Sequence, residues 1–196
     1  MITIDEITIV RDGREIIYDY SEQIPAGSIT VIVGPNGCGK STLLAAIAGD
    51  IAPVKGTITI DDVHPILTSP QALSRIRAMA VQNQSYTLGF TVQQVIEMAG
   101  PSADVMEALE LSALAHRQVT ALSGGETARV SIAAAIAQKT PVLLLDEPLA
   151  AQDVQSRKRI IELLQKLAER GVTVVVVVHS SESELSWADK IIKDFL

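Results

Sequence analysis

A glycine-rich run near the N-terminal end holds the side chains best suited to binding phosphate: Gly34, Pro35, Asn36, Gly37, Cys38, Gly39, Lys40, Ser41 and Thr42. Glycines let such a loop curl so that its backbone N–H groups point at phosphate oxygens. Lys40 adds a positive charge for the outer phosphates, and the Ser41 hydroxyl is suited to holding Mg²⁺. An apolar segment precedes the run and a helix-like segment follows it, so a bound phosphate would face the start of a helix. These residues predict a phosphate-binding loop.

Two acids follow an unbroken apolar segment later in the chain. Residues 142–145 predict a strand buried on both faces, and Asp146 and Glu147 come directly after it. Ligands of open α/β sheets bind at the carboxyl ends of such strands. At that place Asp146 can hold Mg²⁺, directly or through water, and Glu147 can polarise an attacking water.

A second candidate anion site begins another helix and consists of Ser123, Gly124, Gly125 and Glu126. Two glycines at a helix start, capped by serine, can bind an anion. The spacing of Ser123 and Glu126 also fits an ordinary capping box, and both interpretations can hold together. The chain therefore either binds phosphates at two places or completes a site on another copy. A two-fold dimer would close two identical sites at once.

The elements that must position these residues alternate between strands and helices, which predicts an α/β core. Residues 2–10 predict a strand with a bulge or bend near Glu6, followed by a hairpin turn, and antiparallel strands are expected beside the core. The remaining expected strands cover 15–21, 56–60, 172–178 and 190–196, and the expected helices cover 91–99, 102–115, 127–139, 154–170 and 182–188. The helical stretch at 83–139 would be inserted between core strands.

The composition favours one globular domain over residues 1–196, because 47% of the residues are hydrophobic. A net charge of −7 disfavours nonspecific binding to nucleic acid, so no nucleic-acid partner is expected. Apolar runs such as Val174–Val178 are far too short to cross a bilayer. The single cysteine permits no internal disulfide and fits a reducing cytosol.

Over residues 3–195 the chain resembles the nucleotide-binding subunit of an ABC transporter. The run from Gly34 resembles the Walker A motif, residues 122–126 the signature motif, and residues 142–147 Walker B with its catalytic glutamate. Gln82 resembles the glutamine of the Q-loop, with Gln84 as the less favoured candidate. His179 resembles the switch histidine, and Asp153 the aspartate of the D-loop.

This resemblance implies a fold and a set of roles. The expected fold is an α/β P-loop NTPase of ABC type, with a mixed sheet core, an N-terminal antiparallel β-subdomain and the inserted helical subdomain at 83–139. The expected cofactors are ATP and Mg²⁺, with Ser41, Gln82 and Asp146 on the metal. Glu147, His179 and Gln82 would serve catalysis, and residues 123–126 would contact the ATP of a partner chain.

The resemblance also implies partners and a place in the cell. A head-to-tail dimer closed by ATP would bind a transmembrane permease, so the chain is expected to be cytoplasmic and peripheral on the inner face of the cell membrane. We expect import of an iron complex, haem or a metal ion, with a substrate-binding protein if the system is an importer. The alternatives are a short exporter-type subunit and a soluble ABC-type ATPase in cofactor assembly.

Three departures from the family pattern carry further expectations. Arg11 stands where an adenine-stacking aromatic residue is frequent, and its planar guanidinium could stack instead. Gln152 stands where leucine is usual in the D-loop, which predicts an altered dimer seam. The chain stops near residue 196, which predicts that no C-terminal regulatory domain follows.

Overall fold

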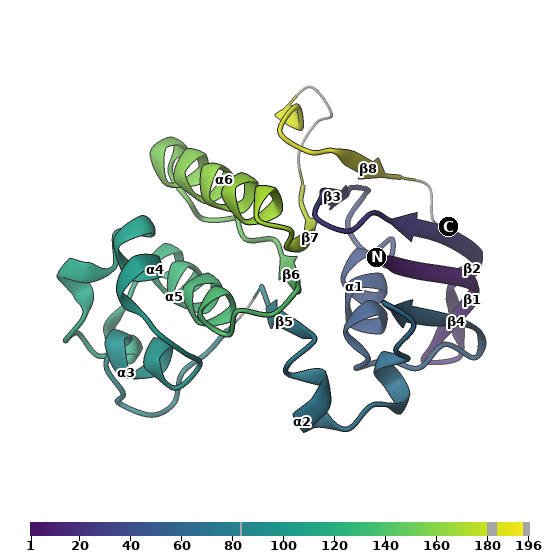
Figure 1. Ribbon diagram of the computed structural model, residues 1–196, viewed down its shortest axis with the longest axis horizontal. Helices are drawn as coiled ribbons and strands as arrows, with labels where there is room; N and C mark the ends of the chain where they lie inside the picture. Colours follow the sequence, from purple (N-terminus) through teal and green to yellow (C-terminus); the bar gives the residue numbers. More distant parts are fainter. Residues whose placement is uncertain (83, 180–183, 194–196) are drawn as a thin grey trace.

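The computed structural model describes residues 1–82, 84–179 and 184–193. Two sheets enclose one helix between them, and most of the remaining helices gather on the far side of the larger sheet (Figure 1). The larger sheet is parallel and has the order β5-β6-β7-β3-β8. Its strands are β3 (Ile29–Ile32), β5 (Arg77–Ala80), β6 (Val142–Asp146), β7 (Thr173–Val177) and β8 (Lys190–Ile192).

The inner strands of this sheet are covered on both faces. Every residue of β3 and β7 is buried, and in β6 only the terminal Asp146 is not fully buried. Runs of valine and leucine without polar alternation therefore form the strands that the sequence predicts, because each face has a hydrophobic layer to contact. The strand expected at 190–196 is β8, and residues 194–196 lie outside the described residues.

The smaller sheet is antiparallel and has the order β2-β1-β4. Its strands are β1 (Ile2–Arg11), β2 (Arg14–Ile24) and β4 (Lys55–Ile60). The pairing of β1 shifts register between Ile4 and Ile7, and Glu6 takes a φ of 46°. The irregularity predicted near Glu6, a bulge or a bend, is thus confirmed, and it lets side chains on both sides of it reach the core.

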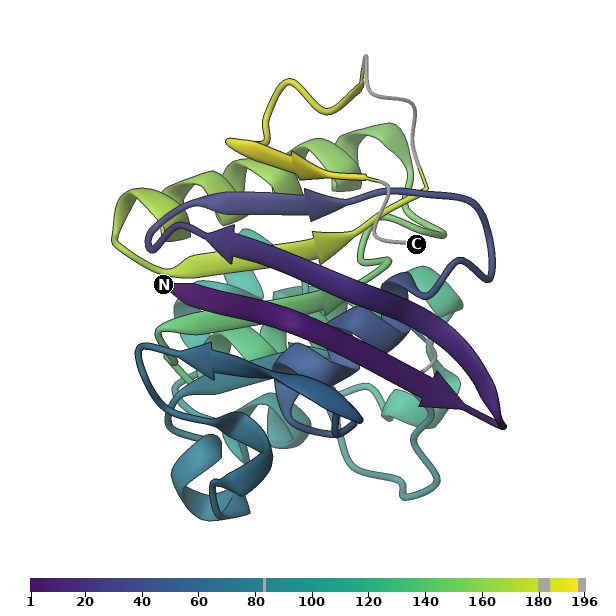
Figure 2. The same cartoon turned by 90° about the vertical axis from the view of Figure 1, so that its right-hand side faces the viewer.

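Helix α1 (Lys40–Ala48) lies between the two sheets (Figures 1 and 2). One buried cluster joins Ile7 of the small sheet, Leu44 and Ile47 of α1, and Leu144 and Val175 of the large sheet. Burial of a side chain of this size contributes about 1.5–3 kcal/mol. The phosphate-binding loop therefore leads into a helix held on two sides.

The helices between β5 and β6 form a lobe on the opposite face of the parallel sheet (Figure 1). They are α3 (Val92–Glu97), α4 (Ala103–Ala108) and α5 (Gly124–Ala137), with 3₁₀ turns at Ser112–Leu114 and Val119–Ala121. A 3₁₀ turn at Pro65–Leu67 and α2 (Pro70–Leu73) precede β5, and α6 (Val154–Glu169) follows β6.

Two helix predictions need correction. A continuous helix over 102–115 is wrong, because α4 ends at Ala108 and Glu110 takes a left-handed φ of 55°. The chain turns there so that Leu109 and Leu111 can both be buried. The helix expected over 182–188 begins at residues that lie outside the described ones, and the described residues 184–188 form no α-helix.

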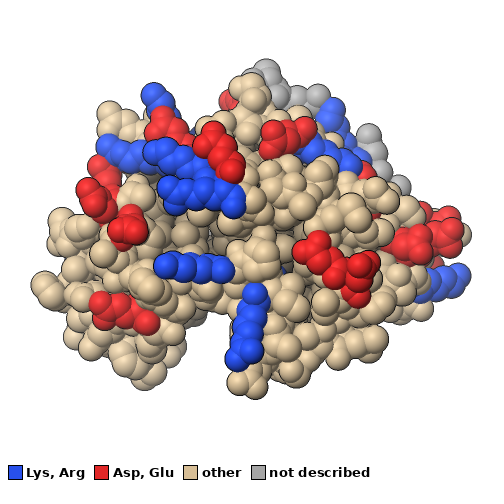
Figure 3. All heavy atoms as spheres, in the orientation of Figure 1, with Lys and Arg blue, Asp and Glu red and all other residues tan. Residues whose placement is uncertain are grey.

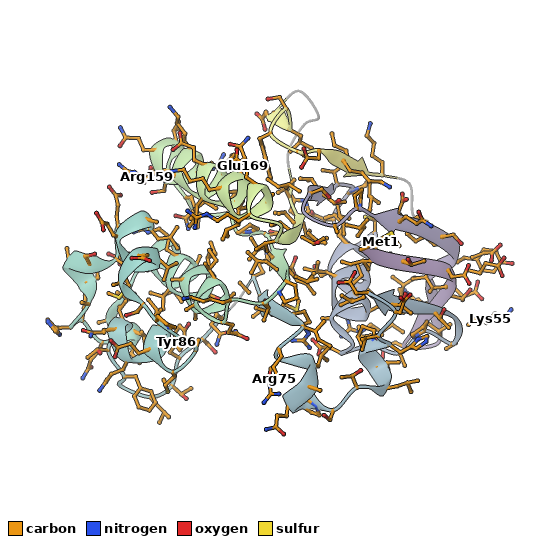
Figure 4. The ribbon with its side chains drawn as sticks, viewed as in Figure 1. Met1, Lys55, Arg75, Tyr86, Arg159 and Glu169 are labelled. Carbon is orange, nitrogen blue, oxygen red and sulfur yellow. The ribbon has the colours of Figure 1, made fainter. Side chains whose placement is uncertain are left out.

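Helix α6 covers the parallel sheet beside the lobe, and its outer face carries much of the positive charge seen in Figure 3. Arg159, labelled in Figure 4, forms an ion pair with Glu110 at the end of α4. This contact joins α6 to the lobe. In the described part of the chain, no helix has both the length and the hydrophobicity needed to span a bilayer.

Candidate functional site

The glycine-rich run forms a loop between β3 and α1. Gly37 and Gly39 have positive φ angles of 78° and 100°, which an L-residue adopts only with strain. A Cβ atom on Gly39 would also lie 2.7 Å from Ile16 Cγ2 on β2. Glycine at this position thus allows the loop both to turn and to pack closely beneath the first hairpin.

Lys40, the first residue of α1, is 5% exposed and turns back into this loop. Its Nζ donates hydrogen bonds to the carbonyl oxygens of Gly34 at 2.9 Å and Pro35 at 2.8 Å. The ammonium group is therefore held at the concave side of the loop, where a phosphate would lie.

Ser41 and Asp146 meet where α1 begins and β6 ends. Ser41 Oγ donates a hydrogen bond to Asp146 Oδ1 at 3.1 Å. Among the described residues, no group of three or more His, Cys, Asp or Glu side chains could hold a metal ion. Mg²⁺ needs no such cage, since one or two protein oxygens together with waters and substrate phosphates satisfy it. The adjacent hydroxyl and carboxylate oxygens fit this ion.

Glu147 occupies a strained backbone position just beyond β6. Its φ is 52°, in the left-handed region that is unfavourable for glutamate, and its N–H donates to the carbonyl of Val177 at 3.0 Å. Its carboxylate accepts a hydrogen bond from Gln82 Nε2 and pairs with His179 Nε2. The Glu147 side chain is 12% exposed, so these two contacts are made largely away from solvent.

The sheet order explains this meeting of three distant residues. Gln82 follows β5, Glu147 follows β6 and His179 follows β7, and these three parallel strands are neighbours. Parallel strands end at the same edge of a sheet, so residues just beyond them face the same space.

Asp146 carries a raised pKa. Burial is the largest cause, the hydrogen bond from Ser41 opposes it, and the charge of Glu147 adds to the increase. Folding therefore disfavours the ionised carboxylate, and stability falls as the pH rises from the ordinary pKa of aspartate through the higher folded pKa.

We expect Asp146→Asn to stabilise the nucleotide-free chain at neutral pH. The carboxyl is only partly buried, so solvent screening limits the gain to less than about 1 kcal/mol. A chain of this length would show an increase in Tm of no more than about 2–4 °C. Thermal unfolding across the pH range checks this: the two proteins should converge below about pH 3.9. Equal Tm values at neutral pH would contradict the expectation.

One open cleft of about 890 Å³ gathers most of the predicted site. It is lined by Arg11, Asp12, Ile16, Asn36, Gly37, Gly39, Lys40, Ser41, Thr42, Gln82, Glu147 and His179. Gly34 and Cys38 belong to the same loop but do not line the cleft, and Gln84 does not line it either. The sequence did not predict Asp12 and Ile16 as site residues. They line the cleft only because the first hairpin packs over the phosphate-binding loop.

The segment from Ser123 to Glu126 does not line this cleft. It begins α5, whose buried side chains contact one face of the parallel sheet, whereas α1 contacts the other face. The predicted capping box is present: Ser123 N–H donates to Glu126 Oε2 at 2.7 Å, and Glu126 N–H donates to Ser123 Oγ at 3.3 Å. Hydrogen bonding of the Glu126 carboxylate to the backbone N–H of Ser123, and secondly to the Ser123 side chain, lowers the pKa of Glu126. Ser123 and Gly124 are exposed, so the helix start is open to a ligand.

Asp153 also lies outside the cleft and caps α6. Its carboxylate accepts from Ser156 N–H at 2.8 Å and from Ser156 Oγ at 3.0 Å, which lowers its pKa. The structure thus brings together the phosphate loop, Asp146, Glu147, Gln82 and His179, and leaves Ser123–Glu126 and Asp153 elsewhere on the surface.

Comparison with known proteins identifies the family. The sequence model of the ABC transporter family matches residues 17–150, more than half of the chain. The chain belongs to the ABC transporter family. It is an ABC-type ATPase, with the P-loop fold of that family.

Relatives of this ABC ATPase include named import subunits. It is 38% identical over 202 residues to the hemin import ATP-binding protein of Rhodococcus jostii, covering 96% of this chain and 69% of the relative. It is 39% identical over 197 residues to the cobalamin import ATP-binding protein of Halobacterium salinarum, covering 92% of this chain and 49% of the relative.

Solved structures agree with the fold. The ATP-binding subunit of an ABC transporter superimposes with a TM-score of 0.90 at 17% identity, covering 98% of this chain and 85% of that one. A bacterial ABC transporter cassette in a dimeric structure gives a TM-score of 0.83 at 27% identity, covering 98% of this chain and 93% of that one.

Proposed function

We propose that this ABC ATPase works as a head-to-tail dimer that drives a separate membrane permease. The main support for this proposal is that the predicted site residues lie in two separate places on the chain. The groups suited to holding and attacking a nucleotide share one cleft, while the second anion-binding helix start lies outside it. A second copy placed head to tail would bring its Ser123–Gly125 to that open cleft, and the same contact would repeat at the other site.

The roles follow from position. Lys40 exchanges its bonds to the loop carbonyls for bonds to the outer phosphates of ATP. Ser41 and Asp146, with Gln82 in the adjoining cleft, would hold Mg²⁺, which would neutralise phosphate charge. Glu147 accepts the proton of the attacking water, and His179 and Gln82 hold its carboxylate in place.

The base of the nucleotide occupies the end of the cleft formed by the first hairpin. Arg11 and Asp12 line this end, and a guanidinium plane can stack on a base as an aromatic ring does. Arg11 is thus proposed to take the place of a stacking aromatic residue.

Support for the dimer and the permease comes from the relatives. A cassette of similar fold is described in a dimeric structure at 27% identity. The relatives at 38% and 39% identity are named as hemin and cobalamin import ATP-binding proteins. We therefore propose import of an iron complex, haem or another metal complex, with a substrate-binding protein as a further partner. The chain would bind the permease at the cytoplasmic face of the membrane.

Transport by the reconstituted complex tests this proposal. The chain and the permease encoded nearest to its gene are placed in proteoliposomes with ATP on the side of the ATPase. We expect ATP-dependent movement of hemin, cobalamin or a ferric chelate towards the ATPase side, and none with Glu147→Gln. Movement in the opposite direction would identify an exporter, and a chain that associates only with soluble proteins would contradict the transport function.

A further inference from the structure

Gln152 is a buried polar side chain between the loop that follows β6 and the start of α5. It is 6% exposed. Its Nε2 donates to the Gly125 carbonyl at 3.0 Å, and its Oε1 accepts from Arg129 Nη1 at 3.1 Å. Gly125 and Arg129 both belong to α5, so the side-chain amide of Gln152 forms both of its hydrogen bonds with the same helix.

The backbone around Gln152 is fixed as well. Its carbonyl accepts from Arg157 Nε on α6 at 3.1 Å. Ala151 takes a left-handed φ of 57°, and the N–H of Ala150 donates to the Glu147 carbonyl at 3.1 Å. The segment between Glu147 and Gln152 is therefore a short turn held at both ends, which transmits displacement better than a loose loop.

The start of α5 packs directly against this turn. A Cβ atom on Gly125 would lie 2.7 Å from the Ala151 carbonyl oxygen and 3.8 Å from Gln152 Nε2. The absence of a side chain at Gly125 thus permits the close approach on which the Gln152 hydrogen bond depends.

We propose that Gln152 is a positioning residue that fixes the Ser123–Gly125 helix start relative to Glu147 of the same chain. The inference rests on the proposed function in one respect: the helix start acts on the ATP of a second copy. Through Gln152, the position of Glu147 in the cleft of one copy determines the position of the Ser123–Gly125 helix start of that copy. This helix start contacts the ATP in the cleft of the second copy. The two ATP sites of the dimer are thereby coupled.

Two variants separate the contacts of this side chain. Gln152→Met keeps the length and shape but makes neither hydrogen bond. Gln152→Glu can still accept from Arg129 but cannot donate to the Gly125 carbonyl. Gln138→Met, an exposed residue at the other end of α5, is the matched control.

The first measurement is Mg-ATP-driven dimer formation in a Glu147→Gln background, followed by analytical ultracentrifugation. We expect both Gln152 variants to weaken dimer formation about tenfold, the change that loss of one buried hydrogen bond produces. Binding of a fluorescent ATP analogue to the monomer should stay unchanged. With Glu147 intact, kcat should fall and the Hill coefficient for ATP should move towards one, a change that a merely structural defect does not produce.

The second measurement needs no dimer. Amide hydrogen exchange of Glu126 and Thr127, whose N–H groups donate to Ser123 in the nucleotide-free monomer, should be faster, by about tenfold, in both Gln152 variants than in the parent or in Gln138→Met.

Each possible result bears on a different part of the proposal. Unchanged dimer formation and unchanged exchange in Gln152→Met would overturn the proposal. If Gln152→Glu behaves like the parent while Gln152→Met does not, the Arg129 contact carries the effect and the link to Gly125 is wrong. If the Glu147→Gln parent does not dimerise at all, the proposed two-copy function fails. The exchange result then decides the positioning role alone.

Discussion

Replacement of Glu147 by glutamine is expected to leave ATP binding intact and to reduce turnover about 10²–10⁴-fold, the usual contribution of a general base. Glutamine keeps the shape of the side chain and an oxygen that can accept from Gln82 or His179, which both contact the carboxylate in this structure. It cannot accept the proton of the attacking water. In the proposed dimer, uncleaved ATP would continue to bridge the two copies, so dimers should accumulate.

Phosphate release and sedimentation of the same samples measure both effects. Glu162→Gln on α6 is a suitable control, because Glu162 is an exposed glutamate that pairs with Lys158 at 3.9 Å, outside the cleft. It should hydrolyse ATP at the parental rate. Turnover of Glu147→Gln within tenfold of the parent would show that another group activates the water.

Ser123→Arg is expected to abolish turnover, by at least about 100-fold, because a group that stabilises phosphate charge is lost and a bulky side chain replaces it. ATP binding by the monomer should be unaffected, since Ser123 does not line the cleft that holds the phosphate loop. Ser123→Thr is the control, because it keeps the hydroxyl that caps α5.

A mixing experiment identifies which chain provides Ser123 to a given ATP. Lys40→Ala should also be inactive, since its cleft lacks the ammonium group that now contacts the loop carbonyls. In a mixed dimer, an intact cleft from the Ser123→Arg chain would meet an intact helix start from the Lys40→Ala chain. Turnover should therefore reappear in the mixture. Continued inactivity would contradict a site shared between copies.

The sequence predicted most of the site because its motifs are local. The glycines, Lys40 and Ser41 lie within one loop between a strand and a helix, and valine runs mark the strands buried on both faces. The break of the predicted helix at Glu110 was missed, because the burial of Leu109 and Leu111 depends on the packing of the whole lobe. The positions of Asp12 and Ile16 were missed for the same kind of reason.

The contact of Glu147 with Gln82 and His179 could be predicted only with knowledge of the order of the strands in the sheet. Nothing in three separate segments of sequence states that β5, β6 and β7 are neighbours, although the family resemblance placed all three residues in catalytic roles. The hydrogen bonds between Gln152 and α5 likewise depend on tertiary packing. A polar residue next to a helix cap gives no sign from sequence alone that its side chain is buried.

The two bonds from Lys40 to the carbonyls of Gly34 and Pro35 bear on how the cleft discriminates among ligands. A buried ammonium group that already donates hydrogen bonds to carbonyl oxygens gains little free energy by binding a neutral molecule instead. Breaking those hydrogen bonds leaves buried carbonyl oxygens without a partner, which is unfavourable. Only a ligand with several negative oxygens offers contacts strong enough to displace them. We therefore expect the loop to bind nucleotides with longer phosphate chains better than nucleosides and monophosphates, even where the base of the latter fits.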